Sequence, residues 1–364
     1  MMTFLVLYSI ILAYKGLSKA EKQIKADCGM KIFRREPRFE PYSSRSARII
    51  GGSSSSDGEF PWQVSLEVLH PIYGFLGHWC GGVLIDNSWI ISAAHCINND
   101  IFNLPLPALW TAVLGENNRH FESGHEQRIS IEKIITHSHY SHYDHDIVLL
   151  KLAETVKLDN FINKICLPIQ NELTYLLDEH LLNNVIEDRK FSINKKMRPA
   201  QRRRINDRFM RFDNEDRHQE KKLYSSSDSL YDGSASKLEP PYIECVATGW
   251  GMSYKDGEKL SDNLIKTRVL IFDNERCQEV YGEHVNIHEG HLCGGAINGK
   301  GGTCVGDSGG PLNCRLHKNG PWVLAGITSF GSGCSSFDGN PYHPDVYIRI
   351  SYYIKWIVKT MSQN

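Results

Sequence analysis

The sequence lacks an apolar run of the roughly 20 residues that a helix needs to cross a bilayer. It has no Asn-x-Ser or Asn-x-Thr triplet, so N-glycosylation is not expected. No two cysteines stand in Cys-x-x-Cys spacing, which disfavours a zinc cluster. The charge is nearly balanced, with 41 Lys and Arg against 42 Asp and Glu, and it therefore gives no indication of nucleic-acid binding.

The first 20 residues have the pattern of a secretory signal. An apolar run from Thr3 to Tyr14 has the length of a signal's hydrophobic region, and Ser18-Lys19-Ala20 follows as a cleavage site. A short buried or anchoring helix is the alternative. The ten cysteines, an even number, fit an oxidising compartment. We therefore expect a signal peptide over residues 1–20 and a secreted, extracellular protein without a membrane span.

Three segments carry the residue types of nucleophilic catalysis. Residues 306–312 read Gly-Asp-Ser-Gly-Gly-Pro-Leu, and the small residues let backbone N–H groups crowd around Ser308. A serine hydroxyl is a poor nucleophile until a base takes its proton. Residues 91–96, Ile-Ser-Ala-Ala-His-Cys, supply a histidine, and residues 146–150, Asp-Ile-Val-Leu-Leu, supply a carboxylate. In chain order, the proposed catalytic residues are His95, Asp146 and Ser308.

With these three motifs the sequence resembles the trypsin/chymotrypsin family of serine proteases, from about Ile49 to the C-terminus except for one insert. The resemblance implies an all-β fold of two six-stranded antiparallel β-barrels with the active site between them, and a C-terminal α-helix. It implies a serine endopeptidase that needs no cofactor and cleaves proteins or peptides through an acyl-enzyme. Protein inhibitors of serine proteases are then expected partners.

The family's catalytic roles carry over to matching positions of this chain. Ser308 would be the nucleophile, His95 its general base, and Asp146 the group that orients the imidazole. The backbone N–H groups of Gly306 and Ser308 would form the oxyanion hole. A catalytically silent binding homologue would need a broken triad, and none is visible. An esterase or lipase would need Gly-x-Ser-x-Gly and the order Ser, Asp, His, and neither is present.

Short strand-like runs separated by turns favour the all-β fold. Residues 62–68 alternate apolar and polar like a half-buried strand, and residues 147–152 form a continuous apolar strand. Further strands are predicted at residues 80–85, 89–91, 246–250, 268–272 and 323–330. Tyr353, Ile354, Ile357 and Met361 give the tail, residues 352–361, the period of an amphipathic helix.

Residues 21–48 are polar and basic, and we interpret them as a propeptide ahead of a protease domain over residues 49–364. Arg48 precedes Ile49-Ile50-Gly51-Gly52, which resembles the family's activation site. In the family, cleavage there frees an amine, here that of Ile49. The ammonium pairs with the aspartate before the nucleophile, here Asp307, and orders the oxyanion loop. We therefore expect a zymogen and, as a partner, an activating protease.

The resemblance also implies how the cysteines pair. Loss of one such bridge typically costs about 2–5 kcal/mol of stability. A Cys28–Cys166 bridge would keep the cleaved propeptide attached as a light chain. The implied pairs are Cys28–Cys166, Cys80–Cys96, Cys245–Cys314, Cys277–Cys293 and Cys304–Cys334.

The specificity pocket departs from the trypsin pattern. The position that holds an acid in trypsins is Gly302, followed by Thr303, and an acid appears instead on the opposite wall as Asp345. A buried carboxylate needs a cation or hydrogen bonds, so we expect cleavage after Arg or Lys, with Gly331 leaving the pocket mouth open. A chymotrypsin- or elastase-like preference is the alternative, because the loop before Asp345 is long. Ser329 matches the family residue beside the catalytic aspartate, on a segment expected to pair with extended substrate.

Two further patterns concern metals. One set of residues has the spacing of the family's calcium loop, whose oxygen ligands suit Ca²⁺, with a solvated acidic loop as the alternative. Histidines at positions 137, 139, 142 and 145 also raise a metal site, but we favour an ordinary surface loop. The calcium set consists of Glu116, Asn118, Phe121 and Glu126.

An insert at residues 171–243 replaces what is a far shorter connection in the family. Between Arg189 and Lys222 it carries thirteen Lys and Arg against five Asp and Glu, and a serine-rich stretch follows. Such a composition predicts a disordered segment. We favour a tolerated, solvated insertion; an exosite for an acidic polysaccharide and a processing site at residues 202–204 are the alternatives.

Overall fold

The structure is a computed structural model of the chain. It describes residues 28–31, 52–98, 103–168, 244–252, 259–282, 285–296, 302–315, 320–331 and 344–364. The predicted signal peptide, most of the predicted propeptide including Arg48, the first residue of the predicted protease domain, Ile49, and the predicted insert lie outside these residues. None of the described helices is long and apolar enough to cross a membrane.

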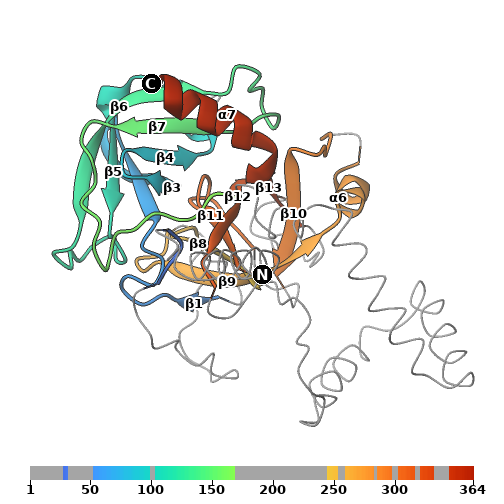
Figure 1. Ribbon diagram of the computed structural model, residues 1–364, viewed down its shortest axis with the longest axis horizontal. Coiled ribbons are helices and arrows are strands. Elements are labelled where there is room, and N and C mark those ends of the chain that lie inside the picture. Colours follow the sequence, from blue (N-terminus) through green and yellow to red (C-terminus); the bar gives the residue numbers. More distant parts are fainter. Residues whose placement is uncertain are drawn as a thin grey trace, which may run out of the picture. The chain divides into compact units, whose positions relative to one another are not determined.

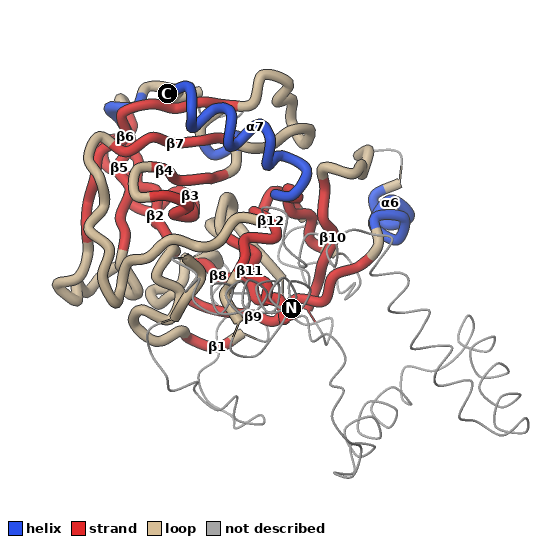
Figure 2. Tube along the Cα trace, in the orientation of Figure 1, coloured by secondary structure: helices blue, strands red, loops and turns tan. Residues whose placement is uncertain are grey.

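Six strands of the N-terminal half close into an antiparallel barrel, in the order β2-β3-β4-β7-β6-β5 (Figures 1 and 2). The predicted strands of this half are confirmed, and β5 and β6 are additions that the sequence pattern did not single out. The strands are β2 Gln63–His70, β3 Gly74–Asp86, β4 Trp89–Ser92, β5 Trp110–Leu114, β6 Gln127–Thr136 and β7 Val148–Leu152.

Strand β2 corrects one prediction, because it is buried on both faces rather than on one. Its apolar side chains fill the barrel, while its polar ones are buried at hydrogen-bonding distance from partners elsewhere in the fold. The Gln63 carbonyl accepts from Thr248 at 2.7 Å, and Ser65 Oγ lies 2.7 Å from His78 Nδ1. Glu67 accepts from Arg128 at 2.7 Å. The alternating pattern of β2 therefore separates an apolar buried face from a polar buried face whose side chains are hydrogen-bonded.

Six strands of the C-terminal half form a second closed barrel, since β8 pairs with β9 and closes the order β9-β10-β13-β12-β11-β8. The short β1, Ser53–Ser54, adds to the outside of β9. The predicted fold of two six-stranded antiparallel barrels is thus confirmed. The strands are β8 Glu244–Gly249, β9 Ile265–Phe272, β10 His291–Ala296, β11 Pro311–Arg315, β12 Val323–Phe330 and β13 Asp345–Arg349.

The helical elements are few. Helix α7, Ile350–Gln363, begins directly after β13 and lies against the first barrel, where Lys151 of β7 donates to the Asn364 carbonyl at 2.9 Å (Figure 1). It buries a stripe at three- and four-residue spacing, Ile350, Tyr353, Ile357 and Thr360. The predicted terminal helix is therefore confirmed. The other elements are α6 Asn274–Tyr281 and the short 3₁₀ helices η1 Ala94–Cys96 and η2 Pro107–Leu109.

Hydrogen bonds connect the two barrels, and disulfides connect segments that are distant in the chain. Trp62 donates its indole N–H to the Asn313 carbonyl at 2.6 Å, across the interface between β2 and β11. The Cys28–Cys166 bridge is confirmed, and Gly29 adds a hydrogen bond at each side, to the Lys164 carbonyl and from the Trp322 N–H. Cys334 lies outside the described residues, so the predicted Cys304–Cys334 pair stays a prediction. The other confirmed pairs are Cys80–Cys96, Cys245–Cys314 and Cys277–Cys293.

Candidate active site

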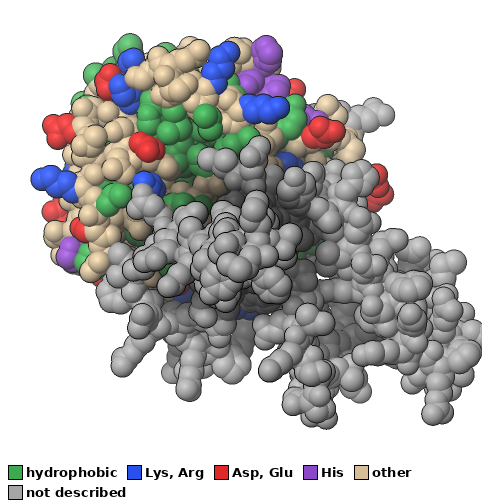
Figure 3. Space-filling view, in the orientation of Figure 1, with side chains coloured by type: hydrophobic (Ala, Val, Ile, Leu, Met, Phe, Trp, Pro, Cys, Tyr) green, Lys and Arg blue, Asp and Glu red, His purple; other side chains and the backbone are tan. Residues whose placement is uncertain are grey.

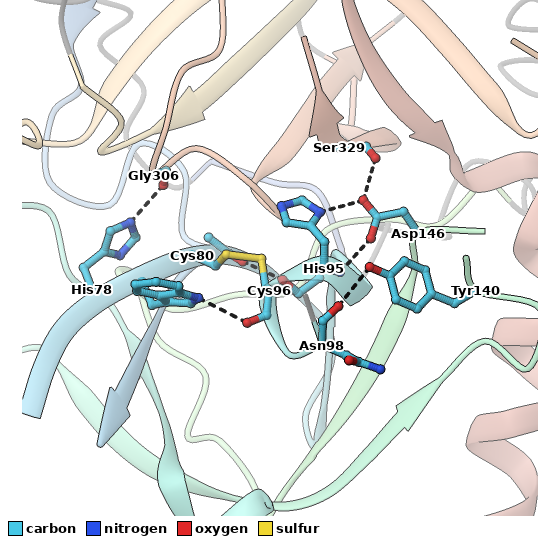
Figure 4. The surroundings of a disulfide bond; sticks show 12 residues. His78, Cys80, His95, Cys96, Asn98, Tyr140, Asp146, Gly306 and Ser329 are labelled. Atoms are coloured by element: carbon cyan, nitrogen blue, oxygen red, sulfur yellow. Dashed lines mark hydrogen bonds and ion pairs between the residues drawn. A yellow bond between two sulfur atoms is a disulfide. The ribbon is translucent and has the colours of Figure 1, made fainter. Parts of the chain in front are cut away.

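The structure brings His95 and Asp146 into direct contact from different elements of the first barrel (Figure 4). His95 lies in η1, directly after β4, and the Cys80–Cys96 disulfide fixes the neighbouring residue to β3. The Asp146 carboxylate accepts from the His95 backbone N–H at 2.8 Å and from its Nδ1 at 2.7 Å. The proton on Nδ1 leaves Nε2 as the nitrogen that can take a proton from another group.

Asp146 is almost fully buried, at 1% exposure, and it has a third donor. Ser329 Oγ in β12 donates to Asp146 Oδ2 at 2.5 Å, as Figure 4 shows. Burial alone would lower the pKa of the His95 imidazole, but the Asp146 carboxylate overrides burial, so the pKa lies above its usual value. The pair is therefore built to stabilise an imidazolium.

The turn that carries Ser308 packs against the segment that carries His95. The Ser308 carbonyl accepts from the Gly81 N–H at 2.8 Å, and Gly81 follows the cysteine that bridges to η1. Gly309 has a φ of 75°, and a Cβ there would lie 3.1 Å from the Ala93 nitrogen. A side chain at Gly309 would therefore separate the two segments, which explains the glycine after the serine.

His78 contacts the turn that carries Ser308, and the sequence motifs did not indicate this residue. Its Nε2 lies 3.0 Å from the Gly306 carbonyl, which can only accept, so Nε2 carries the proton (Figure 4). Nδ1 then accepts from Ser65 Oγ at 2.7 Å. Burial lowers the pKa of His78 to about 4, which keeps the ring neutral. The one signal for His78 in the sequence is its position two residues before Cys80, in a strand expected near the turn of the nucleophile.

Asp307 is buried behind the same turn, at 3% exposure. Its two carboxylate oxygens accept from the Gly251 N–H at 2.7 Å and the Cys304 N–H at 2.9 Å. Burial raises its pKa to about 6, against the effect of these hydrogen bonds. Among the residues that the structure describes, no cation pairs with Asp307. The site thus holds a buried carboxylate that an incoming ammonium would stabilise.

Asp345 lies at the start of β13 between the two predicted pocket glycines. A Cβ at Gly302 or at Gly331 would lie 2.8 Å from an oxygen of its carboxylate. Asp345 Oδ2 also accepts from the Thr303 N–H at 2.7 Å. Burial raises the pKa of Asp345 to about 7, although the bonds from Thr303 act against this. Gly302, Thr303 and Gly331 therefore gather around the Asp345 carboxylate.

The acidic residues predicted to bind calcium make other contacts in the structure. Glu126 accepts from the Ser123 and Gly124 N–H groups within its own loop, at 2.7 and 2.9 Å. Glu116 lies 4.0 Å from Arg128 Nη2, so a guanidinium already stands near this carboxylate. A calcium ion bound by these carboxylates would have to replace these contacts. The calcium site stays an implication of the resemblance, with no step of the chemistry depending on it.

Two closed antiparallel barrels with these residues at their junction define a serine endopeptidase of the trypsin-like class. A model of the family described as Trypsin matches residues 49–176 and 225–357, and the chain belongs to this family. The unmatched residues 177–224 lie within the predicted insert.

Relatives of known sequence agree with this assignment. The protein named Transmembrane protease serine 7 from Mus musculus is 31% identical over 324 residues, covering 87% of this chain and 29% of its own length. The proteins of the same name from Homo sapiens and Rattus norvegicus are 31% and 30% identical, over 87% and 86% of this chain. The chain spans less than a third of the length of these relatives.

Proposed function

We propose that the protein hydrolyses peptide bonds through Ser308, His95 and Asp146. Ser308 Oγ attacks the scissile carbonyl while His95 Nε2 takes its proton, and the imidazolium then protonates the leaving amine. Water repeats the sequence on the acyl-enzyme and restores Ser308. The observation that carries this proposal is the Asp146–His95 pair, with Nε2 left to serve a nucleophile whose turn packs on the same segment.

We infer further that the enzyme is a zymogen secreted to the extracellular space. Cleavage after Arg48 would free the ammonium of Ile49, and the buried carboxylate of Asp307 is the group that it would neutralise. The oxyanion N–H groups of Gly306 and Ser308 lie on either side of Asp307 in the chain, so its pairing sets their geometry. The Cys28–Cys166 bridge would keep the released segment attached.

For specificity, we infer that the Asp345 carboxylate receives an Arg or Lys side chain of the substrate. Its position between Gly302 and Gly331 leaves the approach to it free of side chains at these two positions. A pKa of about 7 means that a fraction of the enzyme carries a neutral pocket at neutral pH. Tolerance for large apolar side chains is therefore a second specificity, stronger at low pH.

The direct test of this function is to profile the activated enzyme on a peptide library and map the cleaved bonds. We expect most cuts to follow Arg or Lys. Cuts spread without preference, or an activated enzyme that leaves the library intact, would contradict the proposal.

Asp345→Asn should reduce kcat/KM for Arg substrates by about 10²–10³-fold, since removing one partner of a buried ion pair costs roughly 2–5 kcal/mol. The side chain keeps its size, so the pocket keeps its shape. Hydrolysis of Leu or Phe substrates by the same variant is the control and should stay within about threefold of the parent enzyme. An equal loss on both substrate types would indicate a misfolded pocket and remove Asp345 from the proposal.

The preference for Arg over Leu should rise with pH. Because the Asp345 carboxyl has a raised pKa of about 7, it is mostly neutral at pH 6 and mostly ionised at pH 8. The ratio of kcat/KM values for Arg and Leu substrates should therefore increase about tenfold over this interval. Taking the ratio cancels the titration of His95, which both substrates share. A ratio that does not change with pH would show that no titrating acid faces the cation.

A further inference from the structure

A second group of polar side chains lies outside the proposed catalytic and substrate-binding residues. Asp144 belongs to the loop between β6 and β7, and His288 and His291 lie just before and at the start of β10. Each of the three offers one ligand atom, and these atoms lie within 4.8 Å of one another. Because the two segments come from different barrels, only the folded protein brings the three residues together.

We propose that Asp144, His288 and His291 form a binding site for Zn²⁺. Two imidazoles and one carboxylate are a donor set that zinc takes in proteins, with water in the fourth position. Imidazole ligands favour zinc over calcium or magnesium, which take oxygen ligands. The ion would join the first barrel to the second next to Asp146.

The distance between two of the ligand atoms supports a metal. His288 Nε2 lies 3.4 Å from Asp144 Oδ1, which exceeds the usual 2.7–3.2 Å of a hydrogen bond. Two ligand atoms on a tetrahedral zinc ion with bonds of about 2.1 Å stand about 3.4 Å apart. The spacing of this ion pair is thus also compatible with a zinc ion bound by both atoms. The Asp144 and His288 side chains are 52% and 25% exposed, so an ion can reach them from solvent.

His291 is oriented to offer a lone pair. Its Nε2 lies 3.0 Å from the Tyr143 carbonyl, which can only accept, so the proton is on Nε2 and Nδ1 is free of one. A metal-binding histidine commonly donates its other N–H to a backbone carbonyl in this way. Nδ1 accepts from the His288 backbone N–H at 3.2 Å, and zinc binding at Nδ1 requires this hydrogen bond to break.

Binding to His288 requires one exchange. His288 Nδ1 accepts from the Gly290 N–H at 2.9 Å, which places the ring proton on Nε2. When zinc takes Nε2, that proton moves to Nδ1 and the bond from Gly290 is lost. The loss favours a reversible, micromolar site over a permanent structural one.

The loop geometry directs Asp144 of the proposed site and the catalytic carboxylate of Asp146 to different partners. His145 separates Asp144 from Asp146 and has a φ of 52°, a left-handed conformation that is uncommon for a residue with a side chain. The turn sends Asp146 toward His95 and Asp144 toward His288. In Figure 3, histidine side chains gather at the edge of this face, where Figure 1 places the loop between β6 and β7.

Three other histidines of this loop, His137, His139 and His145, contact one another. The ring of His137 stacks on that of His145 at 4.7 Å, and His139 meets both edge-on. His145 Nδ1 also contacts the Tyr353 hydroxyl at 3.0 Å. The histidine-rich loop between β6 and β7 thus contributes only Asp144 to the proposed site. Both imidazoles, those of His288 and His291, come from the segment before and at the start of β10.

The test is calorimetric titration of the full-length protein with zinc chloride, which does not depend on catalytic activity. We expect one bound ion per chain and, at a hundredfold excess over Kd, a rise in Tm of about 4–8 °C. Calcium and magnesium chloride should leave Tm unchanged. The variants Asp144→Asn and His288→Asn should each weaken zinc binding by at least about tenfold.

His120→Asn is the matched control, because His120 also lies near a carboxylate, with its Nε2 3.2 Å from Asp262, on an exposed surface. It should bind zinc like the parent. Substitution of His291, which is fully buried, is avoided because it could unfold the protein. Zinc binding that persists unchanged in either Asp144→Asn or His288→Asn, or no binding up to millimolar zinc, would overturn the proposal.

Discussion

Ser308→Ala should lower kcat for peptide hydrolysis by roughly 10⁴–10⁶-fold and leave Tm within about 2 °C of the parent. The change removes one oxygen atom from a half-buried side chain, so the packing around the turn is preserved. The turn itself is held by backbone bonds, from Gly81 to the Ser308 carbonyl and from Gly309 to the Thr328 carbonyl. These bonds do not involve the hydroxyl, and the loss would therefore be chemical.

His95→Ala should cost about as much as Ser308→Ala, and the double variant should cost no more than either change alone. When two residues act together in one catalytic step, losing both lowers the rate no more than losing one. If the two residues acted independently, their fold-losses in rate would multiply. Ser123→Ala, at an exposed serine of the loop before β6, is the control and should hydrolyse peptides at the parent rate. A double variant much slower than both single variants would contradict a shared nucleophile–base unit.

Arg48→Gln should keep the protein inactive, with kcat/KM about 10²–10³-fold below that of the cleaved parent. The expected loss corresponds to one missing oxyanion donor, because uncleaved protein has no ammonium to pair with Asp307. Without the ammonium, Asp307 has only hydrogen bonds from the Gly251 and Cys304 N–H groups, which carry no net charge. Burial therefore still raises its pKa to about 6. Activity on a peptide ester, measured after addition of an activating protease, reports the result.

Two variants separate cleavage from activation. Arg38→Gln lies in the same predicted propeptide, away from the activation site, and should activate normally. Asp307→Asn should be cleaved after Arg48 yet stay inactive, because the new ammonium finds no carboxylate. If Arg48→Gln hydrolysed substrates at the rate of the cleaved parent, the zymogen proposal would fail.

The fold could be predicted from sequence largely because short motifs carry it. The motifs around His95, Asp146 and Ser308 are each contiguous in sequence, so each can be found without knowing what it contacts in the fold. The disulfide pairing came with the resemblance alone, since spacing does not fix which cysteines meet. Four of its five pairs are confirmed by the described residues.

The features that escaped prediction depend on contacts between segments distant in the chain. His78 has no local motif, and its role follows only when its strand lies under Gly306, 228 positions later. The polar face of β2 has the pattern of a solvated face, yet Gln63 bonds to a residue of the second barrel. Asp144 likewise acquires its histidine neighbours only through the meeting of two barrels.

The position of Asp345 relative to Gly302 could be predicted only in part. The sequence indicated an acid on one wall and a glycine on the other, but it could not say whether a long loop displaced the acid. In the structure the carboxylate lies next to both Gly302 and Gly331, and the proposed cationic specificity rests on this arrangement. Its raised pKa, a consequence of burial, has no signature in sequence.

The most direct test of the triad is to treat the protein with a fluorophosphonate after cleavage behind Arg48 and to map the adduct by mass spectrometry. A phosphonylated Ser308, formed quickly in the cleaved parent and at least about 10³-fold more slowly in His95→Ala, is the expected result. An adduct on another serine, or equally fast labelling without the imidazole of His95, would contradict it.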